Sequence, residues 1–240
     1  MPAWYDFVIG HRRTLLGPFW ETIQAGVWVV GLWVIFALTL SKTDEHYLVY
    51  VAAGIVFWNL ISSNISGGSR VFVSKANLIQ NINIPLFTHV LRQIAETLVE
   101  FLFQLPVIVM ALALDRVSVG LETLLVIPGF LMIVLTALWV VPLVGIIATR
   151  YRDASYAIGS MLRFMFFVSP VFWKADGLGE RKFLAHFNPV THYLEIVRAP
   201  LLGLVPSQNS WNVVLVFTLA GLAITLYTFH RFRTRIVFWL

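Results

Sequence analysis

Long uncharged apolar stretches alternate with short charged segments along this chain. Charged side chains are absent from residues 22–40, 47–69, 123–149 and 211–229. Runs of about 18 or more such residues predict membrane-spanning helices, because a helix satisfies its own backbone hydrogen bonds in lipid. The bilayer is therefore the predicted solvent for most of the protein.

The pattern predicts an all-α integral membrane protein with one transmembrane domain over residues 1–240 and six spans. We expect the spans at about 22–40, 47–65, 88–114, 124–148, 154–173 and 211–229. Residues 1–20 carry apolar side chains at helical spacing, and Gly17-Pro18 interrupts this pattern before the first span. This favours a cytoplasmic interfacial helix over an N-terminal extension of span 1.

A seventh apolar segment, residues 183–203, is too short to span and too apolar for a free loop. Asn188-Pro189 predicts a helix start, with Asn as N-cap and Pro in the first turn. Leu194, Val197 and Leu201 would then share one face. We expect a re-entrant or interfacial helical hairpin on the periplasmic side, between spans 5 and 6.

Composition agrees with a membrane protein. Apolar residues make up 59% of the chain and charged residues 12%, whereas soluble domains are about half apolar and about a quarter charged. The absence of cysteine excludes disulfides and thiol nucleophiles. The net charge of +5 reflects where Lys and Arg lie relative to the bilayer, so nucleic acid is not an expected partner.

Lys and Arg near the span ends predict the orientation, because they accumulate on the cytoplasmic side. The opposite short loops hold only Lys42 and Arg116. One side collects Arg12, Arg13, Arg70, Lys75, Arg92, Arg150, Arg152, Arg231, Arg233 and Arg235. Both termini are therefore predicted to be cytoplasmic, which requires an even number of spans.

Catalytic and nucleotide-binding signatures are missing from the sequence. Gly67-Gly68-Ser69 lacks the Gly-Lys-Ser/Thr ending of a phosphate-binding loop. Carboxylates that could hold a metal or perform acid–base catalysis are not clustered. We expect no catalytic residue, metal or cofactor in this chain, and we expect a partner to supply the energy for its work.

Four ionisable residues lie near or inside predicted spans, where they are costly. Arg92, Glu96 and Glu100 follow one helical face at i, i+4 and i+8, and Arg163 lies within span 5. One interpretation is that Glu96 or Glu100 neutralises Arg163 inside the bundle. The other is that these groups line a polar pathway near the cytoplasmic entrance.

Aromatic residues are frequent in two spans. Trp28, Trp33 and Phe36 lie in span 1. Phe167, Phe172 and Trp173 lie towards the end of span 5. Lipid contact and an interfacial aromatic belt explain part of this set. Alternatively, the rings line a pore for glycans, because aromatic faces stack on the apolar surfaces of sugars.

Several motifs, in order along nearly the whole chain, resemble the transmembrane subunits of ABC transporters that export polysaccharides, especially O-antigen and similar lipid-linked glycans. They are Arg13-Thr14-Leu15-Leu16-Gly17-Pro18-Phe19-Trp20, Ala53-Gly54-Ile55-Val56-Phe57-Trp58-Asn59, Arg150-Tyr151-Arg152-Asp153, Phe167-Val168-Ser169-Pro170-Val171-Phe172-Trp173, Asn188-Pro189, 194–203 and the Arg-rich tail ending Phe238-Trp239-Leu240.

The resemblance implies a multi-pass protein of the bacterial inner membrane that forms a homodimer above two ATPase subunits, which bind ATP and Mg²⁺. It implies that spans 1 and 5 line the channel and that 183–203 closes its outer mouth. The substrate would be an undecaprenyl-type lipid-linked glycan. The residues expected to couple to the ATPase are Arg13, Leu16, Gly17, Lys75, Asn81, Asn83 and Pro85.

The expected function is thus a permease, not an enzyme, that moves O-antigen-like polysaccharide outward during lipopolysaccharide biosynthesis. Alternatives are export of teichoic acid, capsule polysaccharide, or a small molecule or lipid. A membrane-embedded glycan-modifying enzyme is a third hypothesis, which would require catalysis at Glu96, Glu100 or Asp153.

Overall fold

The helices follow the apolar pattern closely. The structure, a computed structural model, describes residues 15–39, 46–82, 84–118, 120–175, 179 and 182–240. Within these residues every regular element is helical. The elements are α2 (Phe19–Thr39), α3 (Tyr47–Gly68), η1 (Val73–Lys75), α4 (Ala76–Asn81), α5 (Leu86–Leu114), η2 (Leu121–Leu125), α6 (Val126–Arg150), α7 (Ala154–Val168), α8 (Lys182–His186), α9 (Pro189–Leu201) and α10 (Gln208–Trp239).

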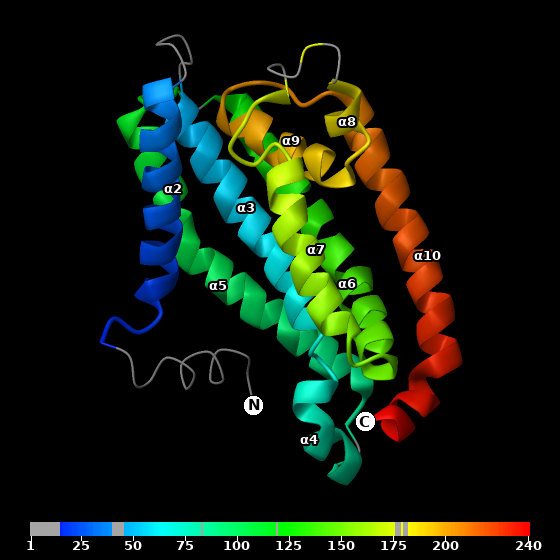
Figure 1. The fold of residues 1–240 in the computed structure, drawn as a ribbon. Helices are drawn as coiled ribbons and strands as arrows, with labels where there is room; N and C mark the ends of the chain where they lie inside the picture. The colour runs from blue at the N-terminus through cyan, green and yellow to red at the C-terminus, as the bar shows by residue number, and fades with distance from the viewer. Residues whose placement is uncertain (1–14, 40–45, 83, 119, 176–178, 180–181) are drawn as a thin grey trace.

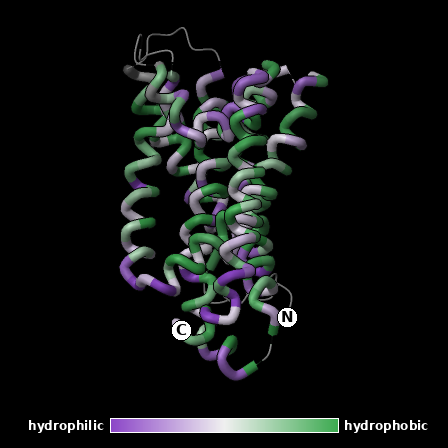
Figure 2. Tube along the Cα trace, turned by 90° about the vertical axis from the view of Figure 1, so that its right-hand side faces the viewer, coloured by the Kyte–Doolittle hydropathy of each residue, from purple (hydrophilic) through white to green (hydrophobic). Residues whose placement is uncertain are grey.

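The long helices lie side by side, with short helices at both ends of the bundle (Figure 1). Helix α4 and the C-terminus mark one end, here called the α4 end; α8 and α9 mark the other, the α9 end. Helix α3 is central and contacts α2, α5, α6, α7 and α9. Apolar residues cover the length of the helices, and hydrophilic residues gather towards the ends (Figure 2).

Five helices of the described chain are long and apolar enough to cross a membrane. The predicted fifth span, 154–173, is instead a shorter apolar helix, α7, of 15 residues. Its length of about 22 Å is less than the hydrocarbon thickness. It ends at Val168 because Ser169 is extended, with ψ of 143°, as the residue before Pro170 tends to be. The predicted boundary at 173 was therefore wrong.

The last helix extends beyond the predicted span. Helix α10 continues to Trp239, ten residues past the predicted end at 229. The sequence after Phe229 contains neither Gly nor Pro, so nothing breaks the helix where it leaves the apolar region. Ile236 is fully buried and anchors this extension.

The start of α2 agrees with the predicted break. Gly17 has φ of 54°, in the left-handed region that glycine tolerates, and the helix begins at Phe19. The proposed interfacial helix, 1–20, falls mostly on residues 1–14, which lie outside the described residues.

The predicted helix start at Asn188-Pro189 is confirmed. Asn188 is the N-cap of α9, and its side chain accepts a hydrogen bond of 3.0 Å from the Val190 backbone N–H. Helix α9 has 13 residues and packs against α3, α6 and α10. Leu194, Val197 and Leu201, which were predicted to share one face, are all buried. Re-entry of this segment into the membrane stays a prediction.

A buried arginine holds the chain where α7 ends. Arg198, on α9, donates hydrogen bonds to the carbonyls of Pro170 (2.8 Å) and Val171 (2.9 Å). Its guanidinium lies 3.8 Å from the ring centroid of Tyr50. Burial lowers the pKa of Arg198, and the Tyr50 and Tyr47 side chains counter part of this shift. Carbonyls that left the helix at Ser169 thus regain partners inside the bundle.

Two tyrosines of α3 extend this connection. The Tyr47 hydroxyl donates to the Phe172 carbonyl at 2.6 Å, and the Tyr50 hydroxyl donates to the Trp173 carbonyl at 2.8 Å. The backbone of residues 170–173 is therefore bonded to both α3 and α9.

A second polar network joins α9 to the first turn of α10. Glu195 accepts hydrogen bonds from the Ser210 hydroxyl (2.6 Å) and the Ser207 backbone N–H (3.0 Å). His192 Nδ1 lies 2.7 Å from the same Ser210 hydroxyl. Burial raises the pKa of Glu195, but the hydrogen bonds and His192 outweigh it, so this pKa lies below its usual value. The carboxylate thereby fixes the turn between the two helices.

The closeness of α3 to the 170–171 turn requires glycine at position 54. A Cβ there would collide with the Val171 carbonyl oxygen and lie 2.5 Å from the Arg198 guanidinium. We therefore predict that Gly54→Ala lowers the free energy of unfolding by about 1–3 kcal/mol. The measurement is the melting temperature of the purified protein in detergent.

The matched control is Gly31→Ala in α2, because no atom lies within 4 Å of a Cβ at that position. The control should melt at least as high as the wild type. Equal melting temperatures for the two variants would show that α3 does not approach the turn this closely.

Candidate functional site

A cavity of about 550 Å³ lies between α2, α3 and α7. Its lining combines aromatic rings, hydroxyls, an amide and one guanidinium within the helical bundle, and we call it the polar cavity. The lining residues are Trp28, Ile55, Trp58, Asn59, Ser62, Ser66, Gly159, Leu162, Arg163, Phe166 and Phe167. A mixed lining of this kind is typical of ligand sites.

One stripe of α3 supplies the uncharged polar groups. Asn59, Ser62 and Ser66 recur at i, i+3 and i+7, which places them on one helical face. The sequence reasoning missed this stripe, although small polar residues interrupting an apolar span at helical spacing were the available signal. Hydroxyl and amide groups there can both donate and accept hydrogen bonds.

Arg163 contributes a positive charge to the lining of the polar cavity. It is exposed and lines the polar cavity, and its Nη2 donates to the Ser160 hydroxyl at 3.1 Å. One interpretation is that Glu96 or Glu100 neutralises Arg163, but Glu96 pairs with Arg92 instead. Arg163 thus offers the cavity a cation that suits an anionic or hydroxyl-rich ligand.

A partly buried hydrogen-bonded relay joins the cavity wall to the neighbouring helices. Asn59 Nδ2 donates to Gln104 Oε1 at 2.9 Å, and Gln104 Nε2 donates to Glu21 Oε2 at 3.1 Å. The relay connects α3, α5 and the first turn of α2. Glu21 and Gln104 were not predicted as site residues, because nothing in the sequence indicates that these helices meet there.

The aromatic lining centres on Phe166. Its ring lies 6.4 Å from Trp28 and 5.7 Å from Trp58, centroid to centroid, with both pairs edge-on. Phe167 is an exposed neighbour at 5.4 Å. Trp28 is 60% exposed, so its ring is available to a ligand or a partner.

The other predicted aromatic channel residues lie elsewhere. Phe36 packs against buried Phe172 at 5.3 Å, towards the α9 end. The Trp173 indole donates to the Phe167 carbonyl at 2.9 Å. Trp33 is exposed and is not among the residues that line the polar cavity. The structure thus brings together Trp28, Arg163 and Phe167 from the predicted channel set.

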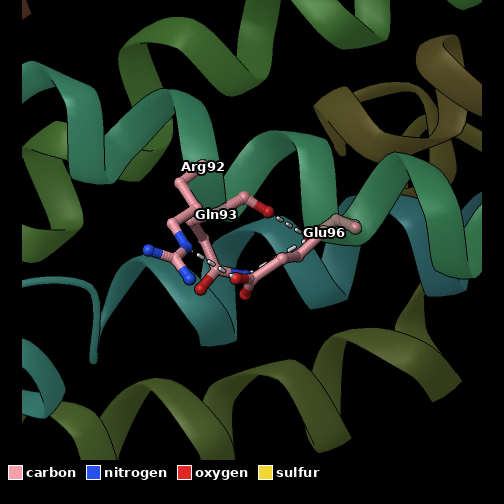
Figure 3. A network of polar contacts seen from close by, with 4 residues as sticks. Arg92, Gln93 and Glu96 are labelled. Atoms are coloured by element: carbon pink, nitrogen blue, oxygen red, sulfur yellow. Dashed lines mark hydrogen bonds and ion pairs between the residues drawn. The ribbon is translucent and has the colours of Figure 1, made fainter. Parts of the chain in front are cut away.

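The predicted entrance charges lie on α5. Arg92 Nε and Glu96 Oε1 form an i,i+4 pair at 3.4 Å, beside Gln93 (Figure 3). Gln93 Nε2 in turn lies 3.4 Å from the Thr97 hydroxyl. Arg92, Glu96 and Glu100 are half-buried and do not line the polar cavity.

The predicted coupling residues fall at helix ends and turns. Leu16 is exposed before α2, Lys75 ends η1, and Pro85 is exposed before α5. Asn81 ends α4, where its Nδ2 donates to the Asn77 carbonyl at 2.7 Å. Arg13 and Asn83 lie outside the described residues. The short η1–α4 segment projects from the bundle, as Figure 1 shows.

Comparison with known families decides the class of protein. Residues 3–202 match the ABC-2 type transporter family. The chain belongs to this family. An ABC-2 protein is the membrane component of an ABC transporter, so this chain works in transport and its multi-pass helical bundle fits that role. No curated protein matches the chain.

The polar cavity should be accessible to water. Because the ABC-2 chain contains no cysteine, single cysteines can report accessibility without background. We predict that Ser62→Cys reacts rapidly with a membrane-impermeant, charged thiosulfonate reagent, since such reagents attack the thiolate in water. Mass spectrometry of the intact protein measures the modification.

Two control variants place the thiol outside the polar cavity, one in a buried position and one on the outer surface of the bundle. Ser210 is fully buried, and Val216 is 65% exposed on α10, where it does not line the polar cavity and is expected to face lipid. The controls are Ser210→Cys and Val216→Cys. Both should react at least about tenfold more slowly than Ser62→Cys. Equal protection of all three thiols would mean that the cavity is dry.

Proposed function

We propose that this ABC-2 chain is the permease subunit of an exporter that moves a lipid-linked polysaccharide, such as O-antigen, out of the cytoplasm. The observation that carries the proposal is the polar cavity, where aromatic rings, hydroxyls and Arg163 are grouped inside a membrane bundle. Sugars need both kinds of contact, because their hydroxyls form hydrogen bonds and their C–H faces pack on aromatic rings.

A second copy of the chain would complete the conduit. Helix α7 has no buried residue within the described chain and borders the polar cavity on one side. Trp28 and Phe167 are more than half exposed beside it. Apposition of two such faces around a two-fold axis would enclose a larger aromatic and polar passage. We therefore propose a homodimer with the passage between α2 and α7 of the two copies.

The α4 end would face the cytoplasm of a bacterium and bind the ATPase subunits. Basic residues lie at or near the ends of several helices there: Arg70 follows α3, Arg150 ends α6, and Arg235 lies near the end of α10. This distribution supports a cytoplasmic location by the positive-inside rule. The turn at Leu16–Gly17 and the segment from Lys75 to Pro85 offer exposed contacts for two ATPases, which would bind ATP and Mg²⁺.

The proposal predicts that loss of the cavity rings impairs transport. Trp28→Ala and Phe167→Ala should each lower export of the lipid-linked glycan by about tenfold, because each ring contact with the moving substrate is lost. Assembly with the ATPase and basal ATP hydrolysis should remain. Vesicles containing the permease and its ATPase would measure export and hydrolysis together.

Phe164→Ala is the matched control, since Phe164 is 66% exposed on the same helix but does not line the polar cavity. Normal glycan export by both cavity variants would refute the proposed conduit. If the vesicles export teichoic acid, capsule polysaccharide, or a small molecule or lipid, but no glycan of the O-antigen type, then the chain is a permease for a different substrate.

A further inference from the structure

A groove of about 350 Å³ lies at the α4 end, between the α4–α5 turn and the last turns of α10. Helix α4 and the C-terminus are close together at this end of the bundle (Figure 1). We call it the tail groove. Arg233 and Thr234 are the polar residues of its lining, and the rest is apolar, including Ile79, Phe87 and Phe229. The tail groove thus combines an apolar surface with one cation.

Contacts on both sides fix the walls of the tail groove. Phe87 of α5 packs edge-on against Phe229 of α10, with the ring centroids 6.0 Å apart. Ile236 is fully buried, and the Arg150 guanidinium lies 5.2 Å from the ring centroid of Trp239. The end of α10 is therefore held against the bundle, and the groove is part of the fold.

Only one of the three arginines at the end of α10 lines this groove. Phe229, Arg233 and Val237 recur at i, i+4 and i+8, so they share one face of the helix, and all three line the groove. Arg231 and Arg235 fall on the opposite side of the helix and do not line it. The groove therefore selects Arg233 from a generally basic segment.

The position of Arg233 along α10 matches the headgroup layer of a bilayer. The uncharged run of this helix ends at Phe229, and Arg233 follows four residues later. For a helix close to the membrane normal, four residues correspond to about 6 Å. Each headgroup layer extends about 5–7 Å beyond the hydrocarbon. Arg233 thus lies at the level of lipid phosphates, with Phe229 at the edge of the hydrocarbon.

The charge around the groove is not balanced by any carboxylate of its own segments. Neither residues 76–87 nor α10 contains Asp or Glu. Arg233 is exposed and forms no hydrogen bond or ion pair with another described residue. A guanidinium of this kind suits a phosphate, which it can bind through two parallel hydrogen bonds. Conversely, the groove offers no carboxylate to pair with the amine of a zwitterionic headgroup.

We propose that the tail groove binds the headgroup of an anionic phospholipid. The phosphate lies against Arg233 and the Thr234 hydroxyl, and the acyl chains pass Phe229 and Phe87 into the bilayer. Basic pockets between helices at the cytoplasmic surface bind anionic headgroups in this way. The site requires only that the α4 end lies at a membrane surface, whichever substrate the transporter moves.

A lipid in the tail groove leaves room for an ATPase. Ile79 lines the groove and is 8% exposed, and α4 contacts α10. The groove is therefore on the side of α4 that faces the bundle, and the opposite side of α4 stays available to a protein partner. A bound lipid would support the η1–α4 segment from behind.

Native mass spectrometry of the full-length protein, purified in detergent and freed of lipid, tests the site. The probes are dioleoylphosphatidylglycerol, which is anionic, and dioleoylphosphatidylcholine, which has the same chains and phosphate but also a quaternary amine. We expect the first phosphatidylglycerol to bind at least about tenfold more tightly than phosphatidylcholine. Arg233→Gln should weaken this first binding step by at least about tenfold, because a charge-assisted contact with the phosphate is lost.

Arg231→Gln is the matched control, since it removes the same charge from the same helix at an exposed position outside the groove. It should change the affinity for phosphatidylglycerol by less than about twofold. Thr234→Trp is a second test variant, which fills the groove without changing the charge. It should reduce the preference for phosphatidylglycerol over phosphatidylcholine to less than about threefold.

Three results would overturn the proposal. Equal affinities of the wild type for the two lipids would show that no headgroup is recognised. Equal weakening by Arg233→Gln and Arg231→Gln would show that diffuse positive charge attracts the lipid without a site. If Arg233→Gln and Thr234→Trp leave lipid binding unchanged but weaken association with the ATPase, the groove is a protein contact. None of these measurements involves a glycan, so the outcome is distinct from a failure of the proposed permease function.

Discussion

The path of the chain from the end of α7 back into the bundle as α9 depends on the hydrogen bonds of Arg198 to the carbonyls of Pro170 and Val171. Backbone carbonyls freed inside a membrane protein must find new partners, since lipid offers none. Arg198 and the tyrosines of α3 supply them where α7 ends, and Gly54 leaves the space for this contact. Without that connection, the chain could not leave the helix at Ser169 and return as α9 within the bundle.

Because the chain leaves the helix at Ser169, α7 has only 15 residues, and it packs lightly against the rest of the bundle. The helix contacts mainly α3 and α6 and has no buried residue within the described chain. It nevertheless forms one wall of the polar cavity. Movement of α7 would therefore change the shape of this cavity, whereas the heavily packed α3 would act as the fixed surface.

The sequence predicted what depends on local pattern. Uninterrupted apolar runs located four of the five helices that can span, and Asn188-Pro189 located the start of α9. The fifth, α5, was expected from a shorter apolar run extended back past Glu96 and Glu100. Features that depend on contacts between distant segments were missed: the Asn59–Gln104–Glu21 relay, the carbonyl partners of Arg198, and the split of the aromatic residues. Phe36 and Phe172 pair with each other because the 170–173 turn folds back onto α2 and α3, which no periodicity in the sequence reveals.

The proposed conduit is tested most directly by a cryo-EM structure of the permease with its ATPase and a lipid-linked glycan, stalled by a hydrolysis-deficient ATPase. Density for sugar rings should lie between α2, α3 and α7, against Trp28 and within reach of Arg163. Sugar density outside this region, with the polar cavity empty or filled by side chains of the second copy, would contradict the account.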